Sequence, residues 1–109
     1  MRADAQVLKG HLDTLLLASL EKGPRHGYAV KEALRAGSGA RFDLPTGTIY
    51  PALRRLEAAG LVRGTWSETG GRRLRTYELT SAGRLRLSRD RAAWRDFAAA
   101  VSAILEPAL

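Results

Sequence analysis

Residues 45–79 decide the fold, and they read PTGTIYPALRRLEAAGLVRGTWSETGGRRLRTYEL. The stretch from residue 45 or 46 to residue 59 is predicted to be a helix, because its apolar side chains gather on one side at 100° per residue. Residues 61–66 and 74–79 are rich in β-branched and aromatic side chains, which predicts two strands. The Gly70-Gly71 pair between them is typical of a hairpin turn. A helix followed directly by a β-hairpin is therefore expected.

Three further helices are predicted around this stretch. Residues 7–22 carry leucines at spacings of three and four, and residues 26–36 form a shorter periodic segment. Thr80 or Ser81 is expected to cap a long last helix that reaches about residue 105. Pro51 lies inside the helix predicted to end at residue 59. A proline in a helix interior removes a hydrogen bond and costs about 3 kcal/mol of helix stability. We therefore expect the opening of that helix to be irregular or kinked.

The predicted order is helix, helix, helix, strand, turn, strand, helix, which is the order of a winged helix-turn-helix. The fold class is therefore mainly α with a small β-hairpin. Residues 1–80 are expected to form a winged helix-turn-helix DNA-binding domain, and residues 81–109 a C-terminal dimerisation helix. A chain of 109 residues has room for one compact unit of this kind and no second domain.

Apolar residues of the last helix recur at coiled-coil spacing. Leu87, Trp94 and Val101 are seven residues apart. A single small domain cannot cover such a long apolar seam, so we expect a homodimer, with residues of the first helix beside the seam. The residues expected there are Leu12, Leu16, Leu87, Trp94, Phe97, Val101 and Ile104.

The composition restricts the function. The formal charge is +7, from 18 basic and 11 acidic side chains. Such an excess favours a polyanionic partner such as nucleic acid, with anionic membranes and acidic proteins as alternatives. The chain has no cysteine, no metal-ligand cluster, no secretory signal and no membrane-spanning run. We therefore expect a cytoplasmic protein without metal or cofactor. No phosphate loop, Ser-His-Asp set or paired carboxylates suggest an enzyme.

The candidate nucleic-acid contacts lie on the helix at residues 45–59 and on the hairpin. The outer side of the helix offers hydroxyls near the helix start, where base edges are usually read, followed by two arginines. The hairpin carries three more arginines, which suit phosphates or a minor groove. Alternatively, Tyr50 packs at the edge of the core, the helix arginines are merely solvated, and the hairpin is a solubilising turn. The candidates are Thr46, Thr48, Tyr50, Arg54, Arg55, Arg72, Arg73 and Arg75.

Three stretches match one known pattern: Gly47-Thr48-Ile49-Tyr50-Pro51, His26-Gly27-Tyr28, and the run from Gly71-Arg72-Arg73 to Thr80. Together they resemble the PadR family of transcriptional regulators over residues 12–83. The Gly-Thr-Ile-Tyr-Pro stretch is the most specific part, and the length resembles the short members with one long C-terminal helix. The proline is common in the family pattern, which implies that a distorted helix start accommodates it.

The resemblance implies a homodimer that binds palindromic operators in double-stranded DNA, usually as a repressor, and is released by a small hydrophobic molecule. It places Tyr28 near the DNA backbone, although packing between helices is an equal alternative. It also implies an effector pocket at the dimer seam near Trp94, although such a stripe is more often plain dimer core. A second hypothesis is a winged-helix protein-interaction module that binds nucleic acid only non-specifically.

Overall fold

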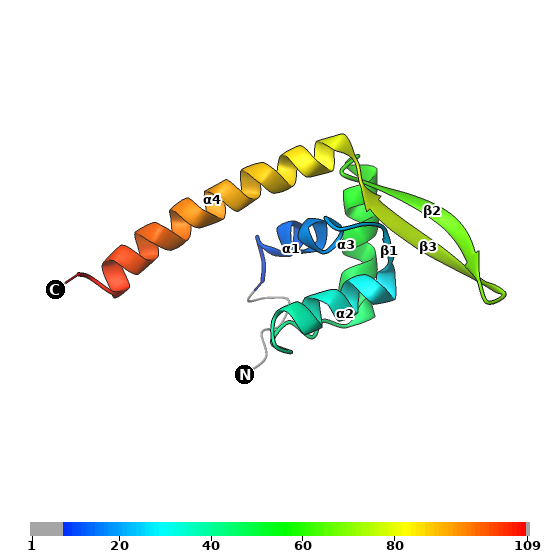
Figure 1. The fold of residues 1–109 in the computed structure, drawn as a ribbon, viewed down its shortest axis with the longest axis horizontal. Coiled ribbons are helices and arrows are strands. Elements are labelled where there is room, and N and C mark those ends of the chain that lie inside the picture. Colours follow the sequence, from blue (N-terminus) through cyan, green and yellow to red (C-terminus); the bar gives the residue numbers. More distant parts are fainter. Residues whose placement is uncertain (1–7, 109) are drawn as a thin grey trace.

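The computed structural model describes residues 8–108, which form four helices and a three-stranded antiparallel sheet (Figure 1). The sheet has the order β1-β3-β2. The winged helix-turn-helix with a long last helix is confirmed, whereas β1 was not expected. The elements are α1 (Leu12–Ser19), β1 (Arg25–His26), α2 (Gly27–Gly37), α3 (Thr46–Ala58), β2 (Val62–Thr69), β3 (Arg72–Leu79) and α4 (Ser81–Leu105).

The core forms around α1, which contacts α2, α3 and α4. Leu16 and Leu17 of α1 have no exposed surface, and they share one apolar cluster with Ile49 and Leu53 of α3. Figure 1 shows α1 enclosed between α2, α3 and α4. Because α1 is apolar on several sides, it serves as the inner layer rather than as a surface helix.

Local caps set the helix starts. The Nδ1 atom of His26 accepts a hydrogen bond from the Ala29 amide at 3.2 Å, so α2 begins directly after β1. The Thr80 hydroxyl accepts from the Gly83 amide at 3.0 Å and begins α4, as predicted. The first helix is shorter than expected, because residues 8–11 form turns and residue 7 lies outside the described range.

The helix α3 runs unbroken from Thr46 to Ala58 in spite of Pro51. Because proline has no amide hydrogen, the Gly47 carbonyl has no donor four residues further on. The helix begins with the amides of Thr48 and Ile49, which both donate to the Pro45 carbonyl, at 2.9 and 3.1 Å. The cost of Pro51 thus falls near the start of α3 and leaves its apolar face intact.

The wing is the hairpin formed by β2 and β3, and its predicted turn at Gly70-Gly71 is confirmed. Only Gly70 and Gly71 connect the strands, with φ of +59° and +77°. Two consecutive positive φ values are those of a type I′ turn, which matches the twist of a hairpin. The strands extend further towards the tip than the predicted residues 61–66 and 74–79, because Arg72 pairs with Thr69 and Arg73 with Glu68 in the ladder.

The last helix projects away from the rest of the molecule, and the whole described chain measures 61 × 31 × 21 Å (Figure 1). Only Gly83 and Leu87 of α4 are buried, so most of its length is exposed in the single chain. Among the described residues, no helix combines the length and apolar character needed to cross a lipid bilayer.

A close contact joins α2 to α3 at Gly27. A Cβ atom placed on Gly27 would lie 2.0 Å from the Cε1 atom of Tyr50, so only glycine lets the ring pack there. Replacing Gly27 by alanine should therefore destabilise the fold, by about 1–3 kcal/mol, because the Tyr50 ring must move. The melting temperature in thermal unfolding would measure the loss.

Gly47→Ala is the matched control, because a Cβ atom there meets nothing within 4 Å. Alanine at an unhindered helical position is neutral or stabilising by up to about 1 kcal/mol. Equal melting temperatures for the two variants would contradict the contact between Gly27 and Tyr50.

Candidate nucleic-acid interface

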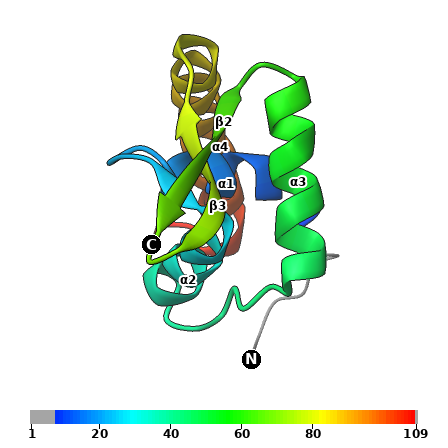
Figure 2. The ribbon, with the colours of Figure 1, turned by 90° about the vertical axis from the view of Figure 1, so that its right-hand side faces the viewer.

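The helix α3 and the wing lie next to each other on one side of the molecule. Figure 2 shows α3 beside the hairpin, and the far end of α4 lies at the opposite end of the long axis in Figure 1. Contacts between α3 and β2 hold the two elements together. The two sets of candidate residues therefore belong to one side of the protein.

The exposed side of α3 carries Thr46 and Arg54, and Thr48 is half-buried. Tyr50, expected on this outer side, is half-buried and packs against the core at Gly27. The hydroxyls and the Arg54 guanidinium lie on a helix whose opposite side holds Ile49 and Leu53 in the core, so the backbone that presents them is fixed. Such a helix can present donors without reorganising.

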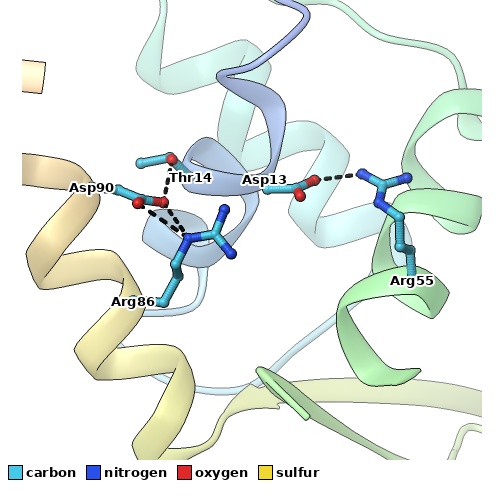
Figure 3. A network of polar contacts seen from close by, with 5 residues as sticks. All are labelled: Asp13, Thr14, Arg55, Arg86 and Asp90. Atoms are coloured by element: carbon cyan, nitrogen blue, oxygen red, sulfur yellow. Dashed lines mark hydrogen bonds and ion pairs between the residues drawn. The ribbon is translucent and has the colours of Figure 1, made fainter. Parts of the chain in front are cut away.

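Arg55 is held by an ion pair with Asp13 of α1 (Figure 3). Its side chain is still 59 % exposed. The next residue of α1, Thr14, donates a hydrogen bond to Asp90 of α4 at 2.7 Å, and Arg86 donates to the same carboxylate at 3.0 Å. Neighbouring residues of α1 therefore connect α4 on one side and α3 on the other.

The wing arginines do not share one face, because successive side chains of a strand alternate. Arg73 and Arg75 lie opposite Glu68 and Trp66, on the face that packs on α3 at its base. Arg72 lies on the other face. The three hairpin arginines that were expected to contact nucleic acid are therefore divided between two faces of a regular hairpin.

Arg75 is directed back to α3, where it forms an ion pair with Glu57. Gly64 makes room for this contact, since a Cβ atom there would lie 2.8 Å from both the Arg75 Nε and the Glu57 Oε2 atoms. Burial raises the pKa of the neighbouring Tyr77, and the Glu57 carboxylate raises it further. Arg75 is thus a structural link between wing and helix, and is only half-exposed.

Tyr28, placed by resemblance near the DNA backbone, is 54 % exposed at the start of α2. The Nζ atom of Lys31 lies 5.9 Å from its ring centroid. The ring is therefore at the surface rather than packed between helices.

A groove of about 670 Å³ lies between α1 and α4. Of the residues expected in a seam pocket, Leu87 and Trp94 line it, whereas Leu16 is buried in the core. Leu12, Phe97, Val101 and Ile104 are not part of its lining.

Several lining residues were missed from the sequence, because the groove is formed by helices distant in the chain. His11 packs edge-to-face on Trp94 with ring centroids 5.5 Å apart. Thr14, Arg86 and Asp90 add a polar wall. Across residues 8–108, no group of three or more His, Cys, Asp or Glu side chains could hold a metal ion.

Comparison with known proteins identifies relatives. The model of the transcriptional regulator PadR-like family matches residues 16–89. A transcriptional regulator of Mycobacterium tuberculosis is 39 % identical over 74 residues, which are 68 % of this chain and 56 % of that protein. An uncharacterized 37.1 kDa protein of a Streptomyces fradiae transposon is 47 % identical over 76 residues. The match covers 70 % of this chain but only 21 % of that longer protein.

Solved structures share the fold. A PadR family regulator from Eggerthella lenta superimposes with a TM-score of 0.80 at 30 % identity, covering 94 % of this chain and 88 % of that one. Bacillus subtilis PadR in complex with operator DNA has a TM-score of 0.67 at 25 % identity, covering 72 % of this chain and 45 % of that one. With the family match over two thirds of its length, the chain belongs to the PadR-like family of transcriptional regulators, which are not enzymes.

Proposed function

We propose that this protein binds operator DNA in the cytoplasm as a homodimer and represses transcription from that operator. The observation that carries the proposal is the cationic surface formed by α3 and the wing. Arg54, Arg72 and Arg73 are exposed on these two adjacent elements. Among residues 8–108, none of the three forms an ion pair with a carboxylate. Three unneutralised guanidinium groups on two adjacent elements suit a polyanion.

The dimensions agree with DNA. A major groove is about 12 Å wide and admits one helix. In the proposed complex α3 enters the groove, Thr46 and Thr48 lie near base edges, and Arg54 contacts a base edge or a phosphate. The wing then reaches the adjacent phosphates or minor groove with Arg72 and Arg73. The fold likeness to a PadR protein bound to operator DNA supports this placement.

Tyr28, Tyr50, Arg55 and Arg75 have smaller parts in this proposal. Tyr28 is available to donate to a phosphate, since its ring is exposed. Arg55 can contact DNA after leaving Asp13, while Tyr50 and Arg75 chiefly fix α3 against α2 and the wing. Direct contacts are thus concentrated on α3 and the outer wing.

The exposed apolar side of α4 supports the homodimer. Trp94, Phe97, Ile104 and Leu105 are 52, 58, 80 and 73 % exposed. Large apolar side chains gathered on one helix mark an interaction site. A second copy would bury this seam and double the cationic surface, as a palindromic operator requires.

Ile104→Glu should therefore shift the protein from dimer to monomer, because it introduces a charge into the apolar seam. Sedimentation equilibrium of the full chain measures this change. Ala103→Glu is the control, since that residue is exposed and lies about 100° around the helix, away from the seam. A monomeric wild-type protein, or equal dissociation by both variants, would rule out pairing through α4.

DNA binding is tested by selecting bound fragments from random duplex DNA. A palindromic motif should be enriched, and Arg72→Ala with Arg73→Ala should weaken binding to it on the order of 10- to 100-fold at moderate salt. The log–log salt slope should become shallower by about 0.9 for each phosphate that the variant no longer neutralises.

Arg89→Ala removes one positive charge from α4, away from α3 and the wing, and should leave affinity unchanged. Unaltered operator affinity in the double wing variant would overturn the wing assignment. Binding without any enriched motif would instead favour the protein-interaction module. Repression follows if a reporter under the selected operator is silenced by the wild-type protein and not by the wing variant.

The groove between α1 and α4 is the proposed site for a small hydrophobic effector. Leu15, Ala18, Leu87 and Trp94 supply apolar walls. An occupant near Thr14 and Asp90 would displace α1 or α4, and Asp13 on the same turn of α1 holds Arg55 of α3 (Figure 3). Occupancy of the groove would thereby alter the position of the DNA-binding helix.

N-Phenyl-1-naphthylamine, a flat neutral fluorophore, should bind the groove and quench Trp94 by energy transfer. Trp66→Phe leaves Trp94 as the remaining tryptophan, so its emission can be followed alone. Excess fluorophore should release operator DNA in a fluorescence anisotropy assay. Binding that persists unchanged in Leu15→Glu, which places a charge in the groove wall, would refute this location.

A further inference from the structure

An exposed tryptophan in the wing has no role in the interface described so far. Trp66 is 59 % exposed on β2 and does not belong to the buried core. It lies directly opposite Arg75 in the ladder, on the face that packs on α3 at its base. The side chains that contact Trp66 must therefore lie on the surface of the wing and not in the core.

Two arginines rest against the Trp66 ring. The guanidinium carbon of Arg73 lies 4.6 Å from the ring centroid, and that of Arg75 lies 5.3 Å from it. Both distances are within the range of about 6 Å for a cation–π interaction, and tryptophan is the best of the aromatic rings for it. The ring therefore restricts two long side chains that would otherwise be free to sample many rotamers.

The contacts form a continuous chain from α3 to the outer wing. Glu57 of α3 pairs with Arg75, Arg75 rests on Trp66, and Trp66 holds Arg73. Arg75 is neutralised by Glu57, whereas among the described residues no carboxylate pairs with Arg73. The charge of Arg73 is thus held in place without being cancelled.

We propose that Trp66 is a positioning residue of the DNA interface, which holds the Arg73 guanidinium ready for a phosphate. The proposal rests on the proposed operator binding by the wing. An arginine already held on an aromatic ring loses less conformational freedom on binding than a free one. Trp66 and the two arginines stacked on it thus hold positive charge at a fixed position on one face of the wing. Arg72 lies on the other face and acts independently.

The test uses the full-length protein and the operator obtained by selection. Trp66→Ala should weaken binding by about 3- to 20-fold, and Trp66→Phe should restore most of the affinity because a ring remains. The salt slope of Trp66→Ala should approach that of Arg73→Ala, which is shallower by about 0.9 if Arg73 neutralises one phosphate. A change that only destabilised the fold would leave this slope unaltered.

Thr65→Ala is the matched control, because Thr65 is an exposed neighbour on the other face of β2. It should leave both affinity and slope unchanged. A double-mutant cycle completes the test: in the Arg73→Ala background, Trp66→Ala should change affinity by about twofold or less.

Three outcomes would overturn the inference. If Arg73→Ala weakens binding and Trp66→Ala does not, the positioning role is wrong while the proposed function stands. If the losses are fully additive, Trp66 does not act through Arg73. If neither variant nor the double arginine variant alters binding, both the inference and the wing assignment fail.

Discussion

Burial of the leucines of α1 is the constraint on which the other elements depend. A helix of eight residues is not stable on its own in water, so α1 exists because its neighbours enclose it. Leu16 and Leu17 are fully buried in the cluster that also contains Leu53 of α3 and Leu87 of α4. Each such side chain contributes about 1.5–3 kcal/mol when buried. The small helix α1 thus sets the orientation of α3 and the direction in which α4 leaves the core.

The ion pairs between helices influence the relative positions of the helices more than they contribute to the free energy of unfolding. Arg91 donates two hydrogen bonds to Glu21, at 2.8 and 3.0 Å, and lowers the pKa of that carboxyl. Both side chains are well exposed, and exposed pairs contribute about 0–1 kcal/mol. The pairs around Asp13 and Asp90 are similarly open to solvent on at least one partner. Apolar burial holds the helices together, and the charged pairs select their relative positions.

Much of the fold could be predicted because it depends on local patterns, such as leucine spacing and the Gly70-Gly71 turn. The strand β1 could not, since two residues carry no periodicity and their pairing depends on Tyr77, distant in the chain. For Tyr50 the sequence left two alternatives, the outer side of the helix or the edge of the core. The helical period puts it outside, but Gly27 of another helix approaches closely enough to cover it. The candidate arginines were recognised by composition, whereas their faces depend on the length of the turn.

The two-residue turn determines on which face of the wing each side chain lies. Arg73, Arg75 and Tyr77 share one face because they are two residues apart, and Arg72 belongs to the other. An insertion of a single residue between Arg75 and Tyr77 would exchange the faces of everything towards the tip, or expel Tyr77 from the core. Adding two residues to each strand would lengthen the hairpin and keep both faces. Lengthening the wing between Tyr77 and Arg73 therefore keeps the face of Arg73 only when an even number of residues is added to each strand, while side chains can change one at a time.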